Sequence, residues 1–122
     1  MVTKNIRPTV ADIRAMKSRG QKISMLYVTS LEEAAAADAA GVDMLSIEGR
    51  FFTPEMRDAA GRCFVQVGLP YGPFGNLITA EDYLKTAYHY MRIGGDCFYC
   101  AASLDSRRRF ATMRCRSSPM SA

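Results

Sequence analysis

A regular alternation of short apolar runs with helix-cap signals is the feature that most constrains how this chain can fold. The apolar runs are Ile23–Val28, Val42–Ile47, Cys63–Val67 and Asp96–Cys100. A short run without polar alternation is typical of a strand that is buried on both faces. Helical segments between such strands predict right-handed βαβ units around a parallel sheet.

The helices are predicted from the residues that begin and end them. Thr9 and Asp12 have the spacing of a capping box, and Gly20 stands where a helix-ending residue takes a left-handed conformation. Three further helices are predicted over 32–40, 54–60 and 80–91. Thr29 or Ser30 can cap the first, Thr53 the second and Thr79 the third. Gly41 ends the first helix and Gly94–Gly95 ends the last.

The last predicted helix contains His89, the single histidine of the chain. The helical period places Leu84, Ala87, Tyr88 and Met91 on one buried stripe. His89 falls on another face together with Lys85 and Arg92, so we expect it on the surface rather than in a catalytic site.

The net charge of +4 does not indicate a nucleic-acid surface, because of where the charge lies. The last 17 residues contain five arginines and no acid, so residues 1–105 have a net charge of −1. A surface that follows phosphates needs basic residues on a folded face.

No apolar run reaches the roughly 18 residues of a membrane span. With no apolar signal core at the N-terminus, we expect a cytoplasmic protein with neither a nucleic-acid nor a membrane partner.

The four cysteines are Cys63, Cys97, Cys100 and Cys115. Without a secretory signal they are expected to be reduced thiols. Cys97 and Cys100 have the spacing of a Cys-x-x-Cys site, but positions i and i+3 of a strand point to opposite faces. We therefore predict two buried small residues there and no zinc or redox site.

One leading helix followed by about four β/α units is compatible with two architectures. Four units can form a small flavodoxin-like sheet. Alternatively, they can form part of a (β/α)8 barrel, which needs about 250 residues in total. The number of units does not separate these two possibilities.

Three stretches resemble the ketopantoate hydroxymethyltransferase family. The most specific is Thr9–Lys17 with Gly20 and Lys22–Leu26, which is very similar to that family's N-terminal signature. The stretch Ala39–Leu45 is similar to its second strand, and Leu69–Tyr71 to the Leu-Pro-Phe after its third. The resemblance covers about 6–105 and also fits the helix over 81–95 with its double glycine.

The resemblance implies that residues 1–105 are the N-terminal part of a (β/α)8 TIM barrel of the phosphoenolpyruvate/pyruvate-binding type. Enzymes of this family transfer a hydroxymethyl group from 5,10-methylenetetrahydrofolate to 2-oxoisovalerate in pantothenate biosynthesis. They use a Mg²⁺ ion that binds the ketoacid, and the resemblance also implies a homo-oligomer for the full-length protein. A hard cation prefers carboxylate oxygens, which a barrel presents at the carboxyl ends of its strands.

The resemblance places the substrate site at the ends of the second and third strands. The candidate substrate-binding residues are Glu48, Gly49, Arg50, Gly68 and Tyr71. Glu48 is also the candidate metal ligand; the alternative is a carboxylate that is solvated or is ion-paired, with Arg50 as the candidate partner. Phe74 is expected beside Tyr71 in the same pocket.

The chain departs from the family pattern at the metal ligands. Gly49 and Gly68 stand where the family has aspartates, and Tyr99 and Ala101 stand where it has a lysine and a glutamate. We therefore expect a divergent, truncated member that is inactive as this fragment. Residues 106–122 are expected to be an irregular basic tail produced by a frameshift, because codons can be chosen whose shifted frame reads like the family's next segment.

Two other functions remain open at this stage. One is a carbon–carbon lyase of the isocitrate lyase/phosphoenolpyruvate mutase group, which uses the same end of a barrel but whose signature loop is not visible here. The other is a non-catalytic binding or structural fragment. Binding of 2-oxoisovalerate that depends on Mg²⁺ separates the enzyme readings from the fragment reading.

Overall fold

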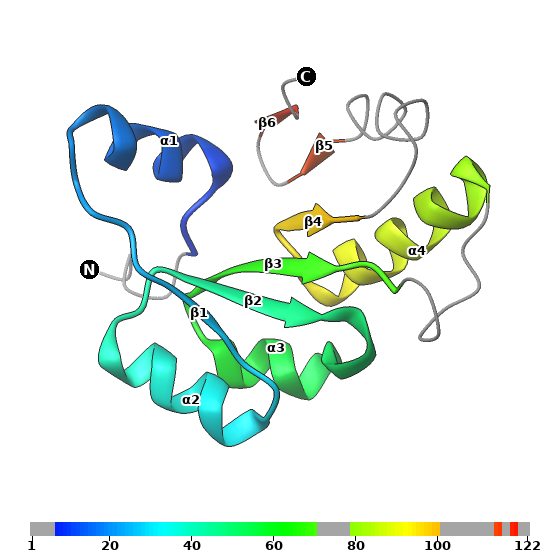
Figure 1. Cartoon of the computed structure of the whole chain (residues 1–122), viewed down its shortest axis with the longest axis horizontal. Coiled ribbons are helices and arrows are strands. Elements are labelled where there is room, and N and C mark those ends of the chain that lie inside the picture. Colours follow the sequence, from blue (N-terminus) through cyan, green and yellow to red (C-terminus); the bar gives the residue numbers. More distant parts are fainter. Residues whose placement is uncertain (1–6, 71–78, 101–113, 116–117, 120–122) are drawn as a thin grey trace.

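Four parallel strands form the centre of the structure, which is a computed structural model that describes residues 7–70, 79–100, 114–115 and 118–119. The strands are β1 (Met25–Tyr27), β2 (Met44–Glu48), β3 (Phe64–Gly68) and β4 (Cys97–Tyr99). They lie side by side in chain order (Figure 1). The α/β class and the parallel sheet that the sequence predicts are therefore confirmed.

The helices begin at the predicted caps. They are α1 (Val10–Ser18), α2 (Leu31–Ala40), α3 (Pro54–Ala60) and α4 (Ala80–Ile93), and the 3₁₀ turn η2 (Gly49–Phe51) follows β2. The hydroxyls of Thr9 and Thr79 each complete a capping box. Ser30, and not Thr29, caps α2. The predicted left-handed glycines at 20, 41 and 94 all have positive φ angles.

The strand order separates the two architectures that the sequence left open. A flavodoxin-like sheet reverses its order at a switch point, which places β1 between other strands. Here the order is sequential, and right-handed crossovers then place successive helices on the same face. This arrangement is compatible with a partial β/α repeat such as a barrel contains. The TIM-barrel type itself stays a prediction.

One face of the sheet packs against the helices and forms the core. Leu45 pairs with Val65 and Ile47 with Val67, and all four side chains are fully buried. The same cluster contains the inward-facing residues of three helices, which are Ala34 and Ala37 of α2, Met56 and Ala60 of α3, and Tyr83, Ala87 and Tyr90 of α4. Figure 1 shows α2 and α3 below the strands and α1 above the ends at which the strands begin.

The opposite face of the sheet, which we call the open face, carries a different set of side chains. The register aligns Ser46 with Gln66 and Cys97, and Glu48 with Gly68 and Tyr99. Ser46, Gln66 and Glu48 are all half-buried. The open face is therefore polar toward the carboxyl ends of the strands.

The prediction that the first strand is buried on both faces is wrong. Met25, Leu26 and Tyr27 of β1 are about half exposed, and only Val28, just beyond the strand, is buried. Among the described residues β1 pairs with β2 alone and is the edge of the sheet. An apolar edge strand has neighbours on one side only, so its composition does not guarantee burial.

The buried stripe of α4 also differs from the predicted one. Tyr83, Ala87 and Tyr90 are buried, whereas Tyr88 is 50% exposed. The end of the Tyr90 ring occupies the space that a side chain at Gly49 would take, and Leu84 and Met91 pack partly buried against the core as predicted. His89 is exposed, as predicted.

Cys97 and Cys100 are half-buried, so the prediction that both are buried is wrong, while Cys63 is buried. The side chain of Cys97 lies on the open face, whereas Cys100 packs against the core on the opposite face of the sheet. In the part of the chain that the structure describes, no three His, Cys, Asp or Glu side chains are grouped to hold a metal ion.

A buried ion pair at the amino-terminal ends of the strands connects two β/α units. The Arg57 guanidinium of α3 donates from Nη1 to Asp96 Oδ2 at 3.3 Å, and the backbone N–H of Val65 donates to the same oxygen at 3.0 Å. Arg57 also donates from Nη2 to the carbonyls of Gly61 and Cys63 at 2.7 and 2.9 Å. The sequence gives no sign of this network, because its partners are 39 residues apart.

The tail beyond the sheet contains a short element that its composition does not predict. Strands β5 (Arg114–Cys115) and β6 (Ser118–Pro119) pair antiparallel as a separate two-stranded sheet. Among the helices that the structure describes, none is long and apolar enough to cross a bilayer.

Candidate functional site

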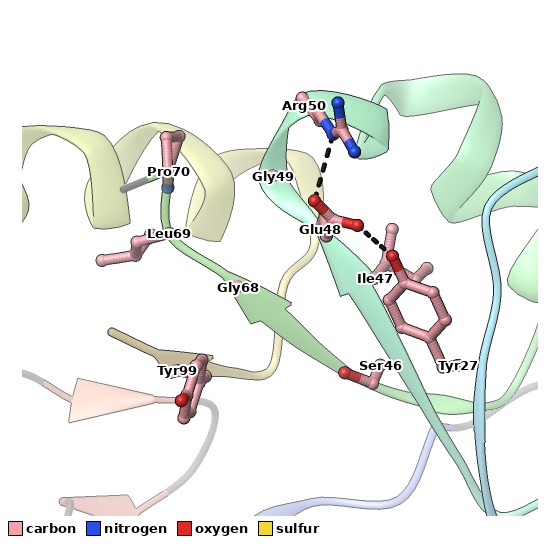
Figure 2. Close-up of a pocket in the computed structure, with 10 residues that line it drawn as sticks. All are labelled: Tyr27, Ser46, Ile47, Glu48, Gly49, Arg50, Gly68, Leu69, Pro70 and Tyr99. Atoms are coloured by element: carbon pink, nitrogen blue, oxygen red, sulfur yellow. Dashed lines mark hydrogen bonds and ion pairs between the residues drawn. The ribbon is translucent and has the colours of Figure 1, made fainter. Parts of the chain in front are cut away.

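A pocket of about 340 Å³ opens at the carboxyl ends of the strands (Figure 2). Its lining consists of Tyr27, Ser46, Ile47, Glu48, Gly49, Arg50, Gly68, Leu69, Pro70 and Tyr99. Four of the five predicted substrate-binding residues are in this set. The fifth, Tyr71, and its expected neighbour Phe74 lie outside the described residues. The position at the strand ends agrees with where parallel β/α folds bind ligands.

Local structure brings Glu48 and Arg50 together. Alternation along β2 puts Ser46 and Glu48 on the open face, and the strand ends at Glu48. The 3₁₀ turn η2 then reverses the chain, so that Arg50 lies above Glu48 (Figure 2). The turn thus brings two residues that are two positions apart into an ion pair at the rim of the pocket.

The Glu48 carboxylate accepts hydrogen bonds on both oxygens. Oε1 accepts from Arg50 Nε at 3.0 Å, and Oε2 accepts from the Tyr27 hydroxyl (Figure 2). The bond from Tyr27 is the main cause that lowers the pKa of Glu48, and Arg50 lowers this pKa further against a partial opposing effect of desolvation. Glu48 is therefore an ionised acceptor at neutral pH and a weak general base.

Arg50 is the cation of the site. Its side chain is 44% exposed, and its guanidinium lies over the Phe51 ring at 4.7 Å from the ring centroid. Contact with an aromatic face holds a guanidinium in place and leaves its planar N–H groups in the plane where carboxylates bind. The alternative prediction for Glu48, a carboxylate paired with Arg50, is confirmed.

Gly49 contributes backbone and no side chain to the pocket. A Cβ atom there would lie 2.7 Å from the Tyr90 hydroxyl and 2.9 Å from the carbonyl oxygen of Gly68. An aspartate, which the ketopantoate hydroxymethyltransferases that the sequence resembles have at this position, would not fit. Gly68 is different, because a Cβ there would meet nothing closer than Glu48 Cα at 3.9 Å.

The described residues do not fit a magnesium site. Mg²⁺ is bound through carboxylate oxygens, water and substrate, in near-ideal octahedral geometry. Glu48 is the one carboxylate in the lining of the pocket, and both of its oxygens are already bonded, one of them to a cation. The prediction that Glu48 is a metal ligand is therefore in conflict with its hydrogen bonds.

Sequence reasoning did not select Tyr27 or Ser46, and it considered Tyr99 only as a departure from the family pattern. All three lie on the open face, because the register places them beside β2 and β3 residues of the same parity. Tyr27 does not stand out in the sequence because its strand is predicted to be buried on both faces. Aligning the predicted strands by the alternation of their side chains would place all three residues on one face of the sheet.

Comparison with known proteins leaves the family open. No protein-family model matches this chain, and no curated protein matches it. The resemblance to ketopantoate hydroxymethyltransferases therefore rests on the residues quoted for it above, and the function follows as a proposal.

Proposed function

We propose that this chain is a divergent β/α-barrel module of the ketopantoate hydroxymethyltransferase type and that its strand-end pocket binds a small 2-oxo acid, with 2-oxoisovalerate as the reference ligand. The observation that carries the proposal is the half-exposed Arg50 guanidinium at the rim of a pocket formed by the carboxyl ends of β2, β3 and β4. A guanidinium is the protein group best suited to a carboxylate, because its N–H groups match the two oxygens.

The rest of the lining supports a branched 2-oxo acid. Ser46 and Tyr99 contribute hydroxyl groups that can donate to a keto oxygen. Leu69 and Pro70 provide apolar surface for a short aliphatic tail. A pocket of this size suits a molecule of a few carbon atoms better than it suits a folate.

The same residues favour binding over hydroxymethyl transfer. Transfer in the related family requires removal of a proton beside the ketone, and Glu48 is a weak base because its pKa is lowered. We propose that this chain binds the ketoacid, does not turn it over, and assembles as a homo-oligomer in its functional form.

Calorimetric titration of the chain with 2-oxoisovalerate tests the proposal. We expect a dissociation constant in the millimolar range or below, and weaker binding of isovalerate, which has the same tail and carboxylate but no oxo group. Equal heats for both acids, or no heat with either, would contradict the proposal. An assay with 5,10-methylenetetrahydrofolate is expected to give no product.

A further inference from the structure

The pocket contains a conflict that bears on how its ligand is held. The carboxylate that the family resemblance assigns to a metal ion, Glu48, is bonded to a guanidinium and to a phenol instead. A divalent cation bound to Glu48 would lie close to the Arg50 guanidinium, and the two positive charges would repel each other at short range. The residues therefore point to a binding mode in which the positive charge is supplied by the protein.

We propose that this site binds its 2-oxo acid without a divalent cation, with Arg50 as the charge that receives the ligand carboxylate and Glu48 as an internal anion that competes for Arg50. This inference rests on the proposed function. In this inference Arg50 raises the affinity for the ligand carboxylate. Glu48, which touches Arg50, lowers that affinity.

Geometry supports the competition between Glu48 and the ligand. Glu48 Oε1 lies 3.0 Å from Arg50 Nε, at the rim of the same pocket that the ligand would enter. A ligand carboxylate that approaches Arg50 therefore meets the negative charge of Glu48 at short distance. Removing that charge while keeping the shape of the side chain relieves the repulsion and leaves Arg50 in place.

The site also has a built-in means of keeping Glu48 charged. The Tyr27 hydroxyl, on the neighbouring strand, donates to Oε2, so the carboxylate is held from the side opposite Arg50 (Figure 2). Gly49 and Gly68 complete the contrast with a metal site, because neither residue brings a second carboxylate to these strand ends.

The experiment is titration of the full chain with 2-oxoisovalerate, once with EDTA and once with excess Mg²⁺. The variants are Arg50→Gln, Arg50→Lys and Glu48→Gln. Arg92→Gln serves as a charge-matched control, because Arg92 is exposed on α4 and does not line this pocket. Urea unfolding of each variant establishes that it is folded before its affinity is compared.

We expect the same affinity with EDTA and with Mg²⁺. Arg50→Gln is expected to weaken binding about 10- to 100-fold, the effect of losing a charge-assisted pair. Arg50→Lys restores part of this loss, since an ammonium keeps the charge but not the planar fork. Glu48→Gln is expected to tighten binding several-fold, and Arg92→Gln to leave it unchanged.

Binding that requires Mg²⁺ and is lost in Glu48→Gln would overturn the inference while supporting the proposed function, because Glu48 would then be a metal ligand. No binding under either condition would overturn the proposed function and this inference together. Cation-independent binding that survives Arg50→Gln would overturn the role of Arg50 alone.

Discussion

The two ends of the sheet each carry an arginine–carboxylate pair, and the two pairs have different surroundings. At the amino-terminal ends, Arg57 and Asp96 are 3.3 Å apart with side chains that are 9% and 0% exposed. At the carboxyl ends, Arg50 and Glu48 are 3.0 Å apart with side chains that are 44% and 30% exposed. The separations are similar, so the difference in solvent contact decides what each pair can do.

The buried pair stabilises the fold, whereas the exposed pair lies where we propose that a ligand binds. A buried ion pair has few alternative partners, and removing one member leaves the other charge without compensation. An exposed pair contributes little to stability, because water and salt replace each partner at small cost. This division agrees with β/α architectures in general, where the amino-terminal ends of strands support stability and the carboxyl ends support function.

Removal of the buried carboxylate should have the largest effect. Asp96→Ala leaves the Arg57 guanidinium buried without its counter-charge, and we expect a loss of about 3–5 kcal/mol in the free energy of unfolding. Urea denaturation followed by far-ultraviolet circular dichroism measures this. The double variant Arg57→Met with Asp96→Leu should recover only part of the loss, because it removes the uncompensated charge but leaves the Val65 N–H and the carbonyls of Gly61 and Cys63 without these partners. A single variant as stable as the parent would show that the network is not structural.

A methyl group at Gly49 should have the next largest effect. The added Cβ would lie 2.7 Å from the Tyr90 hydroxyl, so Gly49→Ala must displace the ring or bend η2. We expect a loss of about 1–3 kcal/mol, as overpacking typically costs. Gly68→Ala is the matched control, since its Cβ would meet nothing closer than 3.9 Å and should leave the unfolding midpoint unchanged. Equal effects from the two substitutions would contradict the packing that the structure describes around Tyr90.

Loss of the exposed cation should affect stability far less than loss of the buried carboxylate. Arg50→Gln removes the hydrogen bond to Glu48 and the contact with the Phe51 ring, both at the surface. We expect no measurable change in the urea midpoint, together with the loss of ligand affinity given above. A drop in stability comparable to that of Asp96→Ala would remove the distinction between the two ends of the sheet.

The smallest effect should be a pH dependence of stability from Glu48. The folded-state pKa of Glu48 is lowered, chiefly by the hydrogen bond from Tyr27. The ionised carboxylate therefore stabilises the folded state above the unfolded pKa, and this stabilisation is lost as the pH falls below about 4.5 through the folded pKa. Urea midpoints measured across this range should decline less in Glu48→Gln than in the parent chain. Glu33, whose pKa is also lowered, chiefly by the Thr29 backbone, should retain its own part of the decline. Superimposable curves for the two proteins would contradict the assignment.

Local signals in the sequence predicted the helices well. The caps at Thr9, Thr53 and Thr79 act within one turn of the chain, and their hydrogen bonds join residues three positions apart. The strands were also placed to within a few residues from apolar runs alone. These elements depend on nearby residues, and the sequence contains that information directly.

Burial and pairing across the chain were predicted less well. Met25 and Leu26 are as apolar as a core strand, yet they are half exposed because their burial depends on what lies beside β1. The Arg57–Asp96 pair and the Tyr27–Glu48 bond join residues 39 and 21 positions apart. Such contacts follow from strand order and register, which composition does not specify.

The tyrosines of the pocket also make the site optically accessible. The chain has no tryptophan and six tyrosines, so its ultraviolet emission comes from tyrosine alone. Tyr27 and Tyr99 line the pocket, and Tyr90 lies against Gly49 beneath it with a pKa raised by burial. Three of the five tyrosines that the structure describes are therefore within or next to the place where a ligand would bind. Intrinsic fluorescence can follow occupancy of this pocket without an added label.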